Sequence, residues 1–228
     1  MTDSTLLLRL AGVTQGWDVR ACNITPAPGA AASTPHGPDD LIPTATGIAG
    51  LLASALGRPR GQWTDLTELP MRVRVDQAGT ARAEFRTRRR RTTAGKVITQ
   101  PTVETVLDDA VFVAGVSGHR EQLERIGEAL SAPRWPLFLG RREFPPTGPL
   151  LLGITDTPSE TALREHPWVA AQWWRQQPPP EALLRLVRVR PTGRGDPAAV
   201  EELAPVTVPN PQGSGIDWLS VLEAPIEG

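Results

Sequence analysis

The sequence predicts an α+β protein with a ferredoxin-like β-α-β-β-α-β domain, a protruding β-hairpin and a short C-terminal extension. Two observations predict this class. First, the 228-residue chain alternates strand-like and helix-like segments in the order strand, helix, strand, hairpin, strand, helix, strand. Second, four consecutive arginines, Arg88–Arg91, lie in a segment without helical period. We expect one domain over residues 1–228, with the hairpin at about 81–107 and the extension at about 175–228.

The first strand and the first helix are predicted by their apolar patterns. "TLLLRLAG" (Thr5–Gly12) is a short apolar run closed by glycine, which is typical of a core strand. In "PTATGIAGLLASALG", apolar residues recur at i, i+3, i+4, i+7 and i+8 from Ile48, which places them on one face of a helix. Thr44 or Thr46 is suited to cap its N-terminus, and Gly57 is suited to end it.

The middle of the chain predicts strands, the hairpin and a second helix. Met71–Asp76 alternates apolar and polar residues as a strand does. Glu84–Thr105 is rich in Thr, Val and Ile around an Ala-Gly pair, which predicts a long hairpin with a basic tip. Asp108–Gly118 predicts a buried strand. Arg120–Leu130 carries apolar residues at i, i+3 and i+7, so it predicts a helix.

The last part of the chain is less regular. "PLFLGRREFPPTGPLLLGI" holds two short apolar runs around a Gly/Pro loop with Arg141 and Arg142. Pro158–Trp174 predicts a helix that "QQPPPE" ends, and Leu183–Pro191 alternates as a strand. The tail from Asn210 is weakly patterned. The same element order underlies RRM-type RNA-binding domains, although a fold by itself does not define function.

The positive charge of this chain is concentrated in one segment. Lys and Arg number 24 and Asp and Glu 25, so the protein is not a generic polycation. Between Arg82 and Lys96, six arginines, one lysine and one glutamate give a net charge of +6, which leaves −7 for the rest of the chain. The arginine run is either a solvated loop or an arm that meets a polyanion. Arginine suits bidentate phosphate contacts, but 23 arginines to one lysine can also reflect a GC-rich genome.

Several classes of protein are disfavoured by what the sequence lacks. Cys22 is the only cysteine, so neither a disulfide framework nor a cysteine metal site is expected. His36, His119 and His166 fit no metal-binding pattern, and no nucleotide-binding glycine motif occurs, so we expect no metal and no cofactor. No apolar run is long enough to span a membrane, and the N-terminus does not resemble a signal peptide. We therefore expect a cytoplasmic protein.

Several stretches resemble one protein family in the right order. They are "LRLAGVTQGW", "PTATGIAGLLASALG", "VRVDQAGT", "LDDAVFVAGVSG" and "ALSAPRWPLFLGRREFPPTGPLLLG". The chain resembles the CasD family, the small RAMP-superfamily subunits of the type I-E CRISPR surveillance complex, Cascade. The resemblance covers most of Leu6–Trp174, and "LGRREFPP" is its most specific part, with Phe144 where the family usually has cysteine.

The resemblance implies a ferredoxin-like RAMP body with a projecting hairpin, the thumb. It implies a subunit that caps the crRNA, grips its 5′ handle, and contacts the CasC backbone subunit and the large subunit CasA. Target DNA would be met only indirectly, and no membrane would be involved. In this subtype another subunit cuts the precursor RNA, so no catalytic residue is expected.

The implied RNA-binding residues fall in three parts of the chain. The first two parts are the opening strand with the first helix, and the thumb, where the arginines would lie on phosphates or stack on bases. The third is the "GRREF" loop. The expected residues are Gln15, Thr44, Thr46, Gly47, Arg86, Arg88, Arg89, Arg90, Arg91, Lys96, Arg141 and Arg142. Gly47 and Gly50 fit either close packing of the helix on the sheet or close approach of a phosphate.

Two other functions remain open. Type I-C relatives of this family cut precursor crRNA, which makes a metal-independent endoribonuclease an alternative. Those relatives use a tyrosine with lysine and histidine, whereas this chain has no tyrosine, and Lys96 has no histidine beside it. The second alternative is an unrelated assembly protein whose arginine arm binds an acidic partner.

Overall fold

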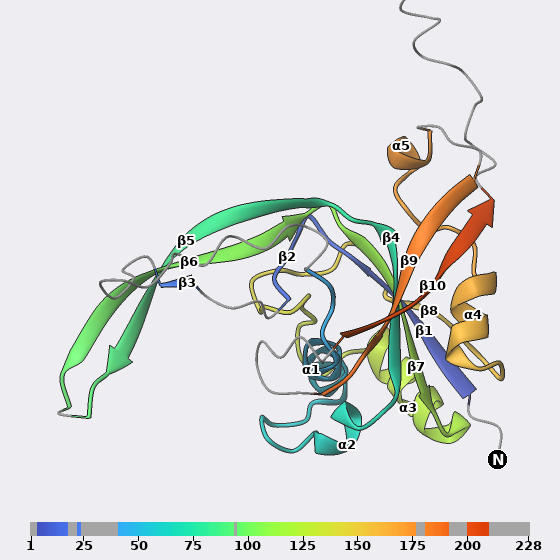
Figure 1. Cartoon of the computed structure of the whole chain (residues 1–228). Coiled ribbons are helices and arrows are strands. Elements are labelled where there is room, and N and C mark those ends of the chain that lie inside the picture. Colours follow the sequence, from blue (N-terminus) through green and yellow to red (C-terminus); the bar gives the residue numbers. More distant parts are fainter. Residues whose placement is uncertain are drawn as a thin grey trace, which may run out of the picture.

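The computed structural model describes residues 4–17, 22–23, 41–93, 95–176, 181–191 and 200–209. Its body is a six-stranded antiparallel sheet, and a second sheet extends away from the body (Figure 1). The spatial order of the main sheet is β10 (Val200–Pro209), β9 (Glu181–Val189), β4 (Met71–Gln77), β7 (Val111–Gly118), β1 (Ser4–Ala11) and β8 (Leu151–Thr155). The protein is therefore a mixed α/β molecule built on antiparallel sheets.

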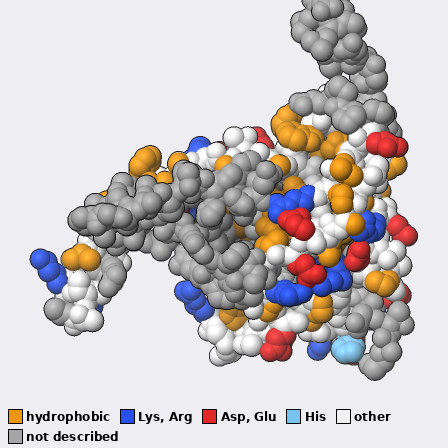
Figure 2. Space-filling view, in the orientation of Figure 1, with side chains coloured by type: hydrophobic (Ala, Val, Ile, Leu, Met, Phe, Trp, Pro, Cys, Tyr) orange, Lys and Arg blue, Asp and Glu red, His pale blue; other side chains and the backbone are white. Residues whose placement is uncertain are grey.

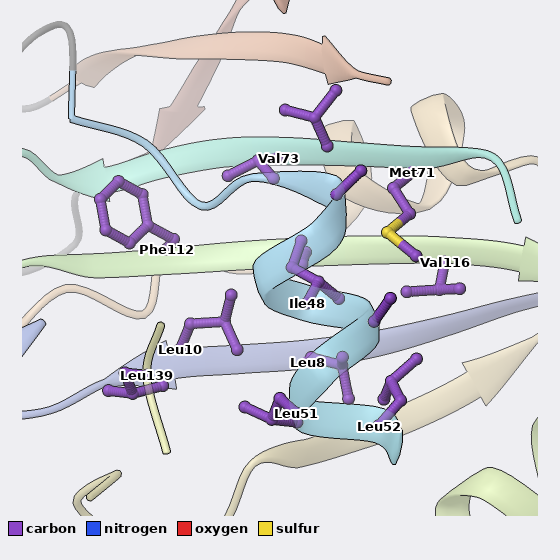
Figure 3. Packing of buried hydrophobic residues seen from close by; sticks show 14 of the residues in the cluster. Leu8, Leu10, Ile48, Leu51, Leu52, Met71, Val73, Phe112, Val116 and Leu139 are labelled. Carbon is purple, nitrogen blue, oxygen red and sulfur yellow. The ribbon is translucent and has the colours of Figure 1, made fainter. Parts of the chain in front are cut away.

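Helix α1 (Ala45–Leu56) covers one face of the main sheet. The Thr44 hydroxyl accepts a hydrogen bond from Gly47 N at 3.1 Å, so Thr44 is the N-cap. Gly57 ends the helix at φ +69°, a conformation that favours glycine. Figure 3 shows side chains of α1, among them Ile48 and Leu52, packed on side chains from β1, β4 and β7. The helix and both of its ends agree with the sequence prediction.

Helix α3 (Arg120–Ser131) joins α1 in covering this face, and α2 (Thr64–Thr67) is a short helical turn beside α1. Leu123, Ile126 and Leu130 of α3 are buried in the same core. A second apolar cluster lies on the opposite face, where α4 (Ser159–Glu165) packs on β1, β4 and β7. Because helices cover both faces, β1 is buried along nearly its whole length.

The predicted single helix over Pro158–Trp174 is wrong. The chain instead forms α4 and α5 (Gln172–Arg175), with His166 already extended at ψ 133°. His166 precedes Pro167, and a residue before proline is disfavoured in the helical region. Arg74 of β4, fully buried, donates to the carbonyls of Leu163, His166 and Pro167, which replaces the lost helical hydrogen bonds.

The second sheet consists mainly of a long antiparallel hairpin. Strands β5 (Thr80–Arg91) and β6 (Val97–Asp108) pair over twelve registered positions, where the sequence placed a hairpin with a basic tip. Figure 1 shows this hairpin curving away from the body. Two short strands, β2 (Thr14–Gln15) and β3 (Cys22–Asn23), also pair with β6.

The C-terminal part of the chain extends the main sheet. Strand β9 pairs with β4 on one side and with β10 on the other, so both strands belong to the body. Residues 210–228 of the expected extension lie outside the described residues. No helix within the described ranges is long and apolar enough to span a membrane.

Candidate nucleic-acid interface

Two glutamates face each other near the base of the hairpin. Glu84 on β5 is directly opposite Glu104 on β6, and like charges in this arrangement destabilise a strand pair. Arg86 lies 2.8 Å from Glu84 and 3.5 Å from Glu104, and it also pairs with Glu143. Arg141 lies 2.8 Å from Glu104 and 3.5 Å from Glu84. We call these five residues the arginine–glutamate cluster.

The "GRREF" loop brings Arg141 to the hairpin. Gly140 has φ +78°, and a Cβ atom there would lie 2.2 Å from the carbonyl oxygen of Gly16, so only glycine fits. Leu139 and Phe144 close the loop through a backbone hydrogen bond of 2.8 Å. The Phe144 ring lies about 6 Å beneath the guanidinium groups of both Arg86 and Arg141 (6.0 and 5.9 Å). The aromatic face therefore supports the two arginines that pair with the glutamates.

The charged side chains of the arginine–glutamate cluster are partly buried as well as paired. Glu104 is only 3% exposed and Arg141 19% exposed, so the charges are partly removed from water. Burial lowers the pKa of Arg141 below its usual high value, and the Glu104 carboxylate acts in the opposite direction. Because the pKa of arginine starts so far above neutral pH, Arg141 stays charged. The cluster thus holds the loop against the hairpin by charge.

A further ion pair lies at the root of the hairpin. Arg82 Nε donates to Asp108 Oδ2 at 2.6 Å, and the Thr14 hydroxyl donates to Asp108 Oδ1 at 2.8 Å. The hydrogen bond from Arg82 lowers the pKa of Asp108, although partial burial raises it. The expected RNA-binding residue Arg86 and its neighbour Arg82 are therefore both engaged by carboxylates of the protein itself.

The outer half of the hairpin is different. Arg89, Arg91 and Lys96 are exposed, and no ion-pair partner for them occurs among the described residues. The side chains of Arg88 and Arg90 lie outside the described part, although their backbone belongs to β5. The stretch from residue 87 to residue 101 holds four arginines, one lysine and no acidic residue. Figure 2 shows basic side chains at this end, whereas acidic and basic side chains alternate over the body.

The expected residues near α1 have mainly structural positions. Gln15 is fully buried, donates to the Ala110 carbonyl at 2.6 Å, and accepts a hydrogen bond from Trp17 Nε1 at 2.8 Å. Its side chain is therefore not placed to contact RNA. The Thr44 hydroxyl serves as the helix cap, while Thr46 is exposed in the first turn. A Cβ atom at Gly47 would meet the Trp17 ring at 2.9 Å, so close packing explains this glycine.

Gly50 has the same explanation. A Cβ atom there would lie 3.0 Å from the Trp63 ring. The packing that Gly47 and Gly50 permit is thus against two tryptophan rings, and not against the sheet as one of the two interpretations had it. Of the residues expected at this end, only Thr46 presents its side chain to solvent, as Arg142 does in the "GRREF" loop.

The two loop arginines should differ in their effect on stability. Arg141→Ala leaves Glu84 and the nearly buried Glu104 facing each other without this partner, so we expect a loss of about 1–3 kcal/mol in the free energy of unfolding. Arg142→Ala is the matched control, because Arg142 is exposed, and its effect should stay within about 0.5 kcal/mol. Urea unfolding of both variants measures this, and equal losses would contradict a structural role for Arg141.

The exposed basic residues of the hairpin suit binding of a polyanion. Within the described ranges, no group of three or more His, Cys, Asp or Glu side chains could hold a metal ion. The exposed arginines and the lysine are cations that can contact phosphates, and they project on a hairpin whose base is fixed by the arginine–glutamate cluster. The outer half of the hairpin is therefore the candidate interface.

Comparisons with known proteins identify the family. The family described as CRISPR-associated protein (Cas_Cas5) matches residues 31–203. A solved structure described as "Crystal structure of Cas protein" is 30% identical, with 92% of this chain and 97% of that chain covered and a TM-score of 0.57. A chain of a "CRISPR RNA-guided surveillance complex" is 27% identical, with 96% and 97% covered and a TM-score of 0.59. No curated protein matches the chain. The chain belongs to the Cas5 family of CRISPR-associated proteins.

Proposed function

We propose that this chain is a non-catalytic crRNA-binding subunit of a type I-E Cascade complex. In this proposal it caps the crRNA, grips the 5′ handle, and contacts the CasC backbone subunit and the large subunit CasA. It meets target DNA only indirectly. The family and the similar chain of an RNA-guided surveillance complex support a role in such a complex.

The single observation that carries RNA binding is the outer half of the hairpin. Residues 87–101 hold five basic residues and no acidic residue, and the side chains of Arg89, Arg91 and Lys96 are exposed. We identify the β5–β6 hairpin as the thumb of a RAMP protein. We also interpret the body as ferredoxin-like, since β1, α1, β4, β7, α3 and β8 follow the order β-α-β-β-α-β and the strands lie as β8-β1-β7-β4.

The positions of the basic groups support a non-catalytic role. Metal-independent RNA cleavage needs a base for the 2′-hydroxyl and an acid for the leaving oxygen. The chain has no tyrosine, and its only lysine, Lys96, is in the hairpin tip. His119 and His166 lie at the ends of α3 and α4 on the body, away from that tip (Figure 1). Among the described residues, Lys96 therefore has no histidine beside it, whereas His36 lies outside them.

Co-purification tests the proposal. A tagged copy expressed with its partner subunits and a CRISPR array should retain crRNA together with CasC, and the same strain without the array is the control. The purified chain, incubated with its repeat RNA in the absence of divalent metal, should leave the RNA intact. Specific cleavage would instead support the endoribonuclease. Recovery of an acidic protein without RNA would support the unrelated assembly protein.

A further inference from the structure

One face of the hairpin carries an exposed aromatic side chain. Phe85 on β5 is 77% exposed, the most exposed of the large apolar side chains that the structure describes. Successive side chains of a strand point to opposite faces, so Phe85 shares its face with Thr87, Arg89 and Arg91. All three of these neighbours are exposed as well.

The two faces of the hairpin differ in chemistry. Glu84 and Arg86 belong to the arginine–glutamate cluster, and Arg86 lies over the ring of Phe144, so that face is turned toward the protein near the base. On the Phe85 face, the residues opposite on β6 are uncharged. The register pairs Phe85 with Val103, Thr87 with Pro101, Arg89 with Thr99 and Arg91 with Val97. Among the residues that the structure describes on these two strands, the Phe85 face thus combines an exposed ring with two cations and no carboxylate.

The spacing of this row fits an extended strand of nucleic acid. A strand rises about 3.4 Å per residue, so the row from Phe85 to Arg91 is about 20 Å long. It places an aromatic ring at the inner end, next to the arginine–glutamate cluster, and guanidinium groups toward the tip. A strand of nucleic acid that follows the row would meet the ring with a base and the arginines with its phosphates.

Single-stranded RNA is the partner that this chemistry fits. Proteins that bind single strands combine cations that follow the backbone with aromatic side chains on which bases stack. In a duplex the bases are already stacked in the interior, where an isolated ring on a hairpin cannot reach their faces. The carboxylates of an acidic protein could pair with Arg89 and Arg91. They would offer no flat surface on which the exposed phenyl ring of Phe85 could stack.

We propose that Phe85 is a stacking platform for a base of single-stranded RNA, while Arg89 and Arg91 contact the adjoining phosphates. This proposal rests on the proposed RNA-binding function and adds a specific contact to it. The arginines contribute to the binding free energy in a way that depends on the salt concentration. The ring contributes to it only when the ligand has a base to stack on. The two contributions can therefore be measured separately.

The test compares two probes that differ only in their bases. The full-length chain is titrated with a short fluorescent oligoadenylate and with an abasic sugar–phosphate strand of the same length, at several salt concentrations. Phe85→Ala should weaken binding of the oligoadenylate about 5- to 150-fold, with an unchanged salt slope and unchanged binding of the abasic strand. Phe85→Trp should restore binding, since a larger ring also stacks.

Leu183→Ala is the matched control, because Leu183 is 71% exposed on β9 and lies on the main sheet, away from the hairpin. It should bind both probes as the unmodified chain does. Wild-type affinity of Phe85→Ala for oligoadenylate, or equal weakening with both probes, would overturn the stacking proposal while RNA binding stands. Loss of a co-purifying subunit with intact RNA binding would also overturn it, in favour of a protein contact. If the unmodified chain binds neither strand, the proposed function itself fails.

Discussion

Replacement of Arg88, Arg89, Arg90 and Arg91 by serine is expected to abolish crRNA retention by the purified complex without a change in thermal stability. Each phosphate that is neutralised by a protein cation releases condensed counterions, and a single strand gives a log–log salt slope of about −0.7 per phosphate. Removal of four such contacts should lower the magnitude of the slope by up to about 3. Fluorescence titration of repeat RNA over a range of salt concentrations measures this change.

The fold should tolerate this change because the outer hairpin contributes little to the core. Arg89 and Arg91 are exposed, and an exposed substitution typically shifts the free energy of unfolding by no more than about 0.5 kcal/mol. Replacement of the same four residues by lysine is the matched control, since it keeps the charge and should keep the salt slope. If the serine variant retains crRNA with the wild-type salt slope, the four arginines are exposed to solvent and do not contact RNA. A thermal shift of many degrees would show that the arginines pair with acidic groups of the protein.

The elements that sequence patterns predicted correctly are those set by local chemistry. In α1, the apolar period, the Thr44 cap and the Gly57 stop all lie within one short stretch of chain, and the structure confirms each of them. The strand predicted over residues 71–76 is likewise β4, because alternation of apolar and polar residues is visible in six consecutive residues. Even so, the pattern over Pro158–Trp174 misled, since Pro167 and the contacts of Arg74 end α4 early.

The candidate site could be predicted less completely, because its contacts join residues that are far apart in sequence. Arg86 and Arg141 are both basic residues in a basic context, yet Glu104 and Glu143 engage them in the fold. Nothing local to Gln15 indicates that its amide would be buried against Trp17 and Ala110. The sequence distinguishes charge from neutrality, but only the fold distinguishes a cation that is neutralised from one that is exposed.

The sequence alone places Phe85 on the same face of the hairpin as Arg89. Phe85 stands four residues before Arg89 in a segment already predicted as a strand, and four is an even separation, which places both side chains on one face. Its exposure could not be inferred, because that depends on which face the "GRREF" loop covers. Phe144 in turn has no local signal, since its contacts with Arg86 and Arg141 follow from the fold of the loop.

A buried ion pair fixes the point where the hairpin leaves the body. Arg74 and Asp76 are two residues apart on β4, both 0% exposed, and they form a bidentate pair at 2.7 and 2.8 Å. Asp76 Oδ2 also accepts a hydrogen bond from Val169 N, and its carbonyl accepts one from Trp168 Nε1, both at 2.8 Å. The segment after α4 is therefore attached to the last residues of β4, directly before β5 begins.

Asp76→Ala should cost about 3–5 kcal/mol in the free energy of unfolding, because it leaves the Arg74 guanidinium buried without its counter-charge. Asp65→Ala is the matched control. Asp65 pairs with Arg58 at 2.6 Å, but its side chain is 52% exposed, and such surface pairs contribute at most about 1 kcal/mol. Urea unfolding should show a much lower midpoint for Asp76→Ala only, with an unchanged slope of free energy against denaturant.

The same substitution should weaken RNA binding through the hairpin root, although Asp76 does not lie in the candidate interface. Gln77, the last residue of β4, donates to the Asp109 carbonyl at 2.5 Å and accepts a hydrogen bond from Ala171 N at 3.1 Å, so both ends of the hairpin depend on the segment that Asp76 holds. The affinity loss should therefore be accompanied by an unchanged salt slope, because no phosphate contact is removed. Equal stability of Asp76→Ala and Asp65→Ala would contradict this account of the buried pair. A salt slope of smaller magnitude for Asp76→Ala would show instead that the substitution disturbs the phosphate contacts of the hairpin arginines.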